Sequence, residues 1–386
     1  MKKNLLILLS YILVAALASA ATLGILSLDT DLAPSKLDQL QKLIDDRFVE
    51  DADMTLLEDA AAAAMIAATG DRWSYYIPAA EYETHLEQAQ NAYVGVGITI
   101  QQAQTPDAGF VVLSVTPGGP AAEAGMLAGD LLIVVENQDV RQMSTAQVRD
   151  LVRGREGTFV NMTVLRQGDH RTFAVERRKI LTPVATHEML GDKIGLVTIA
   201  NFDERCAEEA IAAMETLLDN GAEKLIFDVR HNPGGYASEM VKLLDYLLPE
   251  GELFRMVSHE GEETIDYSDE NCLEIPMAVL VNGGSYSAAE FFAAALQEYE
   301  AAVVVGEQTT GKGYYQNTFR FTDGSAAALS VGKYFTPKGV SLENVGITPD
   351  RKVEVDEETA SAIYYGTLTP QLDPQIQEAV LLLKNK

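Results

Sequence analysis

Apolar and polar positions follow four different patterns along the chain. Residues 5–26 are apolar apart from serines and threonines, and from residue 37 apolar side chains recur at helical spacing. Between residues 93 and 178, short alternating runs are separated by glycines, as in strands and turns. From residue 193 onward, strand and helix patterns alternate. We therefore expect a mixed, multidomain α/β and β protein: an N-terminal helical region, a small β-rich domain and an α/β core with a largely buried sheet.

The stretch 277–316 in the core is the first candidate for chemistry. Its apolar strand, residues 277–281, stops at a breaker cluster, and Ser287 then opens an alanine-rich helix. Unpaired N–H groups in the first turn of that helix can stabilise negative charge beside a Ser287 adduct. A serine at this position can also simply cap the helix, as either Ser285 or Ser287 would. These residues alone therefore do not decide between a nucleophile and a helix cap.

Lys312 follows the next predicted strand, residues 301–305, and lies between two glycines. Gly311 and Gly313 let the backbone pass close to another segment, so that the lysine can point inward. A buried lysine loses its proton more easily and can act as general base for a serine. The rival is a phosphate-binding loop, but Gly313 stands where that motif needs a hydroxyl for magnesium. Strand formers also follow the lysine where that motif needs a helix.

A glycine turn closes the predicted strand 224–229. Gly234 and Gly235 follow a proline and precede a helix, so their N–H groups are placed as in an oxyanion hole. An ordinary strand-to-helix turn has the same composition. His231 beside this turn raises a Ser-His-Asp alternative, but we interpret it as a solvated loop histidine between polar turn residues.

The β-rich region begins with a run in which two glycines alternate with apolar residues. Gly95 and Gly97 allow the close backbone approach of a nest that binds the terminal carboxylate of a peptide. A small β-barrel whose glycines only form turns is the alternative. The candidate peptide-binding residues are Val94, Gly95, Val96, Gly97 and Ile98.

The N-terminal apolar run follows a basic start, Met1-Lys2-Lys3, which is typical of an export signal. Cleavage after Ala20 fits the sequence. The run is nevertheless long enough to span a bilayer, and we favour a retained anchor with the lysines inside. Either way, the remainder of the chain is expected outside the cytoplasm.

Composition excludes several classes of function. The 386 residues suffice for two or three domains, and 29 basic against 57 acidic residues give a net charge of −28, which repels nucleic acid. Cys206 and Cys272 are the only cysteines. The sequence therefore allows at most one disulfide bond and excludes a disulfide framework. The two cysteines and five histidines show no paired ligand spacing, so we expect no metal and no cofactor.

The motifs resemble those of the C-terminal processing (tail-specific) serine peptidases. Residues 285–290, SYSAAE, and 311–316, GKGYYQ, are similar to the family patterns S-A-S-A-S-E and G-K-G-x-x-Q. Residues 228–235 match its D-L-R-x-N-P-G-G motif except for one valine. Residues 70–76 resemble its G-D-P-Y-S-x-Y segment, and residues 120–130 resemble the P-A-x-x-A-G-x-x-x-G-D run of bacterial PDZ domains.

The resemblance implies a Ser-Lys dyad on a crotonase-like core. Ser287 would be the nucleophile and Lys312, twenty-five residues later, the base. Gln316 would hold the lysine in place, by resemblance. The implied oxyanion donors are the N–H groups of Ala288 and of Gly234 or Gly235.

Three positions depart from the family pattern. Tyr286 and Ala289 replace small or hydroxyl residues beside the nucleophile, and Thr310 replaces the aromatic before the glycine. A crowded site would leave a catalytically inactive PDZ scaffold that binds protein C-termini, which is the alternative function.

We predict four parts: a signal or anchor at 1–30, a helical region at 31–90, a PDZ domain at 91–178, and a peptidase core with a C-terminal helix at 179–386. We expect an extracytoplasmic, membrane-anchored serine endopeptidase that cuts proteins near their C-termini, or a secreted one if the leader is cleaved. The expected partners are protein or peptide tails, bound or gated by the PDZ domain, and a membrane. Formation of a homo-oligomer is left open.

Overall fold

The computed structural model describes residues 34–103, 105 and 108–385. By its contacts the chain separates into two units, Met1–Met65 and Ile66–Lys386. Helix α2 (Lys36–Arg47) begins at Ser35, whose hydroxyl accepts the Asp38 N–H while the Asp38 carboxylate accepts the Ser35 N–H. Helix α3 (Met54–Ala67) follows. The N-terminal helices expected from the apolar spacing are confirmed.

The expected membrane anchor, residues 1–30, lies outside the described residues. Among the helices that the structure describes, none is both long enough and apolar enough to cross a bilayer. Anchoring therefore stays a prediction from the sequence.

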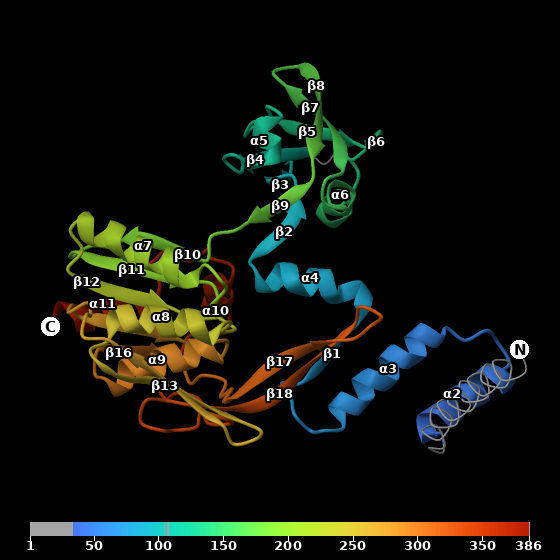
Figure 1. The fold of residues 1–386 in the computed structure, drawn as a ribbon. Helices are drawn as coiled ribbons and strands as arrows, with labels where there is room; N and C mark the ends of the chain where they lie inside the picture. The colour runs from blue at the N-terminus through green and yellow to red at the C-terminus, as the bar shows by residue number, and fades with distance from the viewer. Residues whose placement is uncertain (1–33, 104, 106–107, 386) are drawn as a thin grey trace, which may run out of the picture. The chain divides into compact units, whose positions relative to one another are not determined.

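The β-rich domain is built on an antiparallel sheet with the strand order β3-β4-β5-β7-β8, and β6 pairs with β5 (Figure 1). Phe110, Leu132 and Met162 are fully buried in its core. The Asp130 carboxylate, nearly inaccessible, accepts the Leu127 N–H and the Arg166 guanidinium. The bounds are β3 (Ile98–Gln102), β4 (Phe110–Val115), α5 (Pro120–Glu123), β5 (Leu131–Val135), β6 (Gln138–Asp139), α6 (Thr145–Val152), β7 (Phe159–Arg166) and β8 (Asp169–Glu176).

The α/β core contains a six-stranded sheet with the order β10-β11-β12-β15-β16-β19. All neighbours are parallel except β10 and β11. Parallel strands are usually covered on both faces, which agrees with the complete burial of β15. The bounds are β10 (Ala185–Met189), β11 (Ile194–Ile199), β12 (Lys224–Asp228), β15 (Met277–Val281), β16 (Ala302–Gly306) and β19 (Arg351–Lys352).

Helices cover both faces of this sheet. The larger core cluster contains side chains from α7 (Cys206–Asp219), α8 (Ala237–Leu247) and α9 (Ala288–Glu298), and α11 (Pro374–Lys384) contributes to the cluster on the other side (Figure 1). Helix α11 begins at Asp373, as predicted, with Pro374 in its first turn. The short α10 (Glu357–Tyr364) precedes it.

A second, antiparallel sheet adjoins the predicted lysine loop. Its order is β1-β18-β13-β14, and β17 pairs with β18. The first residues of β17 come directly after the loop that carries Lys312, so this hairpin anchors one end of the loop. The bounds are β1 (Tyr75–Ile77), β13 (Gly251–Ser258), β14 (Glu263–Ser268), β17 (Tyr314–Arg320) and β18 (Ala326–Phe335).

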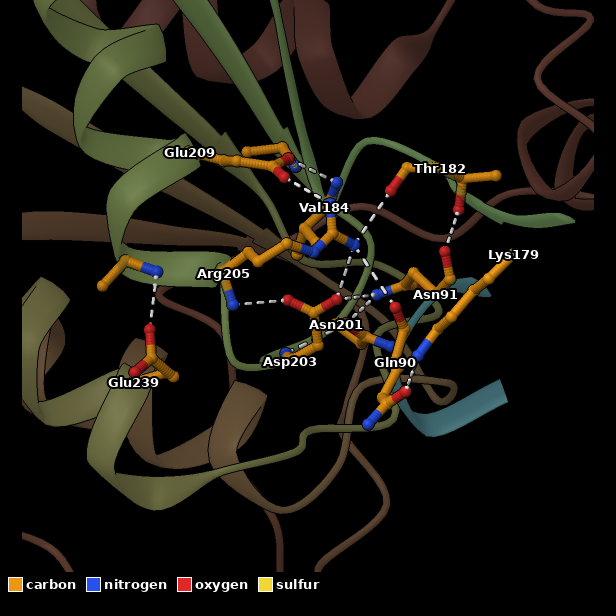
Figure 2. Close-up of polar contacts among 12 residues, drawn as sticks. Gln90, Asn91, Lys179, Thr182, Val184, Asn201, Asp203, Arg205, Glu209 and Glu239 are labelled. Atoms are coloured by element: carbon orange, nitrogen blue, oxygen red, sulfur yellow. Dashed lines mark hydrogen bonds and ion pairs between the residues drawn. The ribbon is translucent and has the colours of Figure 1, made fainter. Parts of the chain in front are cut away.

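Two chain crossings connect the β-rich domain to the remainder of the second unit. After α4 (Ala79–Ala89), strand β2 (Ala92–Gly95) pairs with the returning strand β9 (Arg178–Leu181). Figure 2 shows Arg205, just before α7, at the base of this ribbon. Its guanidinium donates to the carbonyls of Gln90 and Thr182, one from each crossing. Arg205 therefore ties both crossings to the α/β core.

Candidate active site

Ser287 lies at the turn between β15 and α9. It is the N-cap of α9, with φ +58° and ψ −128°, and it is 6% exposed. A positive φ at a residue other than glycine is strained by roughly 1–3 kcal/mol and persists only where the surroundings enforce it. Strained strand-to-helix turns of this kind present nucleophilic serines in other hydrolases. The backbone therefore favours a nucleophile over a simple cap.

Ser285 has a different task in the same turn. Its hydroxyl donates to the Val229 carbonyl at 2.7 Å and accepts the Asn282 N–H at 3.1 Å. The residue is completely buried. With both bonds made inside the protein, Ser285 holds the turn together.

The glycine turn after β12 packs directly against Ser287. Gly234 has φ +87°, and a Cβ built there would lie 2.8 Å from both the Ala288 nitrogen and the Ser287 Cβ. The Gly234 N–H already donates to Asn232 Oδ1 at 2.8 Å. Within the described part of the chain, the N–H groups of Gly235 and Ala288 make no hydrogen bond. These two groups are the ones free to donate to an oxyanion.

Glu290 joins the nucleophile turn to the lysine loop. Its buried carboxylate accepts four hydrogen bonds, and three donors come from the backbone. Burial raises the pKa of Glu290, and the hydrogen bonds oppose that shift. The sequence did not single out this residue, although Glu three positions after an N-cap serine is a capping-box signal. The donors are Ser287 N–H (3.1 Å), Gly311 N–H (2.7 Å), Lys312 N–H (2.8 Å) and the Thr309 hydroxyl (2.5 Å).

Lys312 points inward, as the flanking glycines predicted. Its Nζ lies 5.1 Å from the ring centroid of Trp73 and 5.8 Å from that of Tyr286. Burial lowers the pKa of Lys312, while the nearby carboxylates of Asp71, Glu343 and Glu290 counteract part of the shift. Among the residues that the structure describes, no hydrogen bond joins Lys312 Nζ to Ser287 Oγ. Such contacts are often long before substrate binds, so the geometry leaves the dyad available.

Residues 70–76 form one wall of this site, beyond the helix-to-loop junction expected from the sequence. Arg72 donates to the Gly311 carbonyl at 3.0 Å. The Trp73 indole N–H donates to Glu343 Oε1 at 3.3 Å, and Glu343 Oε2 accepts the Gly313 N–H at 2.8 Å. Trp73, Arg72 and Glu343 were missed as site residues because these contacts join positions far apart in the chain.

Gln316 lies on β17, four residues after the lysine. Its amide donates to the Tyr314 carbonyl at 3.1 Å and to Ser330 Oγ at 3.0 Å. Within the described residues it makes no hydrogen bond to Lys312. The expected role of Gln316 in holding the lysine stays a prediction.

His231 was expected to be a solvated loop residue, but in the structure its side chain is half-buried. Its Nε2 pairs with Asn282 Nδ2 at 2.8 Å, and its ring meets Tyr364 edge-on. Burial, together with Arg230, lowers its pKa. No hydrogen bond links it to Ser287 in the described part of the chain, which argues against a Ser-His-Asp arrangement.

Two further sequence alternatives can be compared with the structure. Lys312 is followed by the strand β17, so the helix that a phosphate-binding loop needs does not follow it. The thiols of Cys206 and Cys272 are free. The residues that the structure describes contain no group of three or more His, Cys, Asp or Glu side chains arranged to hold a metal.

The candidate peptide-binding run starts at the end of β2. Val94 and Gly95 belong to β2, and Ile98 opens β3, an edge strand of its sheet. Gly97 has φ +76°. Across the described chain, the N–H groups of Val96 and Gly97 have no hydrogen-bond partner, so both can donate to an added group, and their role in peptide binding stays a prediction.

Two family models match parts of this chain, and several known proteins are similar to it. Residues 193–353 match peptidase family S41, and residues 111–166 match the PDZ domain. The carboxy-terminal processing protease CtpA of Bacillus subtilis is 30% identical over 370 residues, covering 92% of this chain and 79% of that protein. The chloroplastic carboxyl-terminal-processing peptidase 2 of Arabidopsis thaliana is 31% identical over 300 residues, covering 74% of this chain. The aligned part is 58% of that relative's length.

A crystal structure supports the fold alone. The structure of a protease assigned to S41 from Bacteroides fragilis matches with a TM-score of 0.54 at 15% identity, covering 92% of this chain and 98% of that one. The fold class expected from the sequence, with N-terminal helices, a PDZ sheet and a parallel α/β core, is confirmed.

Proposed function

Because the chain belongs to peptidase family S41, the C-terminal processing serine peptidases, and carries a PDZ domain, we propose that it is an endopeptidase that cuts proteins near their C-termini. One observation carries the proposal. Ser287, strained at the start of α9, contacts the glycine turn after β12 and is joined through Glu290 to the loop that bears the buried Lys312.

The proposed reaction begins with a neutral Lys312. Its amine takes the proton of Ser287, and Oγ attacks the scissile carbonyl carbon. The N–H groups of Ala288 and Gly235 stabilise the oxyanion, because the Gly234 N–H already donates a hydrogen bond to Asn232 Oδ1. Lys312 then gives the proton to the leaving amine, and water hydrolyses the acyl-enzyme. Activity should rise with pH as Lys312 deprotonates, at a lower pH than an ordinary lysine because burial lowers its pKa.

Cleavage assays on the full chain test the dyad. We expect casein and a protein with an unfolded apolar tail to be cut by the parent, and Ser287→Ala and Lys312→Ala to lose at least about 100-fold in kcat/KM. Lys338→Ala, at an exposed lysine, is the matched control. Parent-like cleavage by both dyad variants would exclude this mechanism.

We further propose that the PDZ domain binds substrate tails at residues 94–98. Binding would control cleavage through the paired strands β2 and β9, where the chain enters and leaves this domain. Arg205 holds both crossings (Figure 2), and Asp203 accepts the Asn91 amide. Phe202, the residue before Asp203, donates its N–H to the Gly234 carbonyl at 2.8 Å, and its carbonyl accepts the Tyr236 N–H at 2.7 Å. A shift of the crossings would therefore reach the oxyanion turn within a few residues.

The gating proposal has its own test. Arg205→Ala should abolish the stimulation of casein cleavage by an added tail peptide, whereas Arg149→Ala, exposed on α6, should keep it. Equal stimulation in both variants would show that this contact does not transmit the signal.

The N-terminal sequence supports a proposal about location. We propose an extracytoplasmic enzyme held at the membrane by residues 5–26, or secreted if that segment is removed, acting on protein tails. Protection of the full-length protein from protease added to cells stripped of their outer envelope, with the cytoplasmic membrane intact, would contradict this location.

The alternative is a PDZ scaffold without catalysis. Two observations favour it: the Tyr286 ring beside the nucleophile, and the missing hydrogen bond between Ser287 and Lys312 among the described residues. Tail binding without turnover of any tailed protein would support the scaffold, and cleavage that depends on Ser287 would exclude it.

A further inference from the structure

Two aromatic rings from distant parts of the sequence face the Lys312 ammonium. Trp73 and Tyr286 stack with their centroids 6.0 Å apart and their planes 25° apart. Lys312 Nζ lies within 6 Å of both centroids, at 5.1 Å and 5.8 Å. This is the distance range in which a cation is attracted to the face of an aromatic ring.

Other contacts hold the two rings in place. The Trp73 indole N–H donates to Glu343, and the Arg72 guanidinium lies 4.3 Å from the ring centroid. On the other side, the Tyr286 N–H donates to the Asn232 carbonyl at 3.1 Å, and Tyr286 directly precedes Ser287. The pair therefore forms a fixed seat, which we call the aromatic seat, at the border of the nucleophile turn.

The seat favours the charged lysine. In the described part of the chain, no carboxylate lies within ion-pair distance of Lys312. Asp71, Glu343 and Glu290 act on it from farther away. Two further groups lie beside it: the Tyr286 hydroxyl, whose pKa burial raises, so that it is neutral near pH 7, and the Arg72 guanidinium, whose positive charge over the Trp73 ring opposes the ammonium. Attraction to the rings depends on the positive charge and weakens when the amine is neutral.

We propose that Trp73 and Tyr286 are positioning residues that hold protonated Lys312 away from Ser287 and release it once it has lost its proton. The proton passes to solvent, and the neutral amine then turns to accept the proton of Ser287 Oγ. This inference rests on the proposed Ser-Lys mechanism. It also gives Tyr286, a departure from the family pattern, a role other than crowding.

The chain contains a reporter for this seat, because Trp73 is its only tryptophan. Its fluorescence, excited where tyrosine does not absorb, should titrate with a midpoint below the ordinary lysine value of 10.5. Lys312→Met should abolish the transition. Tyr286→Leu keeps an apolar cover but removes the ring, so the midpoint should fall by about half a pH unit or more. Tyr286→Phe keeps the ring and should leave the midpoint unchanged.

Three results would overturn the inference: a transition that survives Lys312→Met, equal shifts for Tyr286→Leu and Tyr286→Phe, or an upward shift in Tyr286→Leu. Thermal melting checks that each variant is folded, and Tyr286→Met replaces Tyr286→Leu if the latter does not fold. Tyr267→Leu, an exposed tyrosine on β14, is the matched control.

Cleavage assays separate this inference from the proposed function. In an active enzyme, the acid limb of kcat/KM against pH should move downward in Tyr286→Leu by the shift seen in fluorescence, and stay in place in Tyr286→Phe. An acid limb that does not move would overturn the inference. If no form of the protein cleaves while the fluorescence behaves as expected, the proposed function fails and the aromatic seat stands.

Discussion

The turns after β12 and β15 lie side by side at the carboxyl ends of two neighbouring parallel strands, but they present different groups to the site. Each contains an asparagine whose Oδ1 accepts the N–H two residues later, Asn232 from Gly234 and Asn282 from Gly284. The first turn has positive φ at Gly234 and Gly235, where it costs little, and also at His231, which is not part of the oxyanion turn. The second adopts it at Ser287.

The turn after β12 presents backbone N–H groups, whereas the turn after β15 presents a side chain. Gly234 and Gly235 let the chain approach Ser287 and Phe202 so closely that any Cβ would clash. Ser287 must keep its side chain, so its strain is held by the surroundings: Glu290 on its N–H, and Ser285 and Asn282 within the turn. One turn offers donors and the other offers a nucleophile.

The largest effect is expected from adding a methyl group to the first turn. Gly234→Ala would place a Cβ 2.8 Å from the Ala288 nitrogen and 2.9 Å from the Tyr286 carbonyl, at φ +87°. We expect kcat to fall about 10²- to 10³-fold as the oxyanion donors move. Gly168→Ala, also at positive φ but with open space around it, controls for backbone strain. Equal activity of the two variants would remove the glycine turn from the mechanism.

The next effect concerns the bridge to the lysine loop. Glu290→Gln turns one acceptor oxygen into a donor that faces other donors, so we expect roughly 1–3 kcal/mol loss of stability in denaturant melts, with lower kcat. Burial raises the folded-state pKa of Glu290 above its ordinary 4.5, so the native state binds the proton more tightly than the unfolded chain. The parent should therefore lose stability relative to Glu290→Gln as the pH rises from 4.5 through that raised pKa. A pH-independent difference would contradict this account of Glu290.

Ser285→Ala should lower the stability of the protein while leaving most of its activity. It removes the hydroxyl that bonds Val229 and Asn282, so we expect about 1–2 kcal/mol lower stability in denaturant unfolding. Activity should stay within about tenfold of the parent, because the nucleophile remains. Loss of activity as complete as in Ser287→Ala would make Ser285 the nucleophile.

The smallest effect is expected from His231→Gln. Among the residues that the structure describes, Asn282 is the one hydrogen-bond partner of the side chain, and its ring contacts Tyr364. We therefore expect kcat/KM to change less than about threefold and to keep its pH profile. Disappearance of a limb of the pH profile would instead assign a proton transfer to His231.

The sequence predicted the parts of this site that are local. The strand before Ser287, the glycines around Lys312 and the turn at Gly234 all follow from short patterns. Glu290 carries a local capping signal, but its bonds to Gly311 and Lys312 depend on how the next loop folds back. Local patterns describe backbone conformation and cannot show such partners.

The parts that could not be predicted join distant positions. Trp73 and Glu343 are 270 residues apart, and no periodicity relates them. Crowding by Tyr286 was only the ground for the alternative scaffold function, because the sequence shows the size of the side chain and not its contacts; in the structure its ring stacks on Trp73. The hydrogen bonds of Gln316 to Tyr314 and Ser330 likewise depend on the pairing of β17 with β18.

Covalent labelling can identify the nucleophile and measure how far its reactivity depends on Lys312. The full chain is treated with a serine-directed phosphonate at a pH where Lys312 is neutral, and the adduct is located by peptide mass mapping. We expect one adduct on Ser287 in the parent and at least about 100-fold slower labelling in Lys312→Met. An adduct on Ser285, or labelling that proceeds equally fast without Lys312, would contradict it.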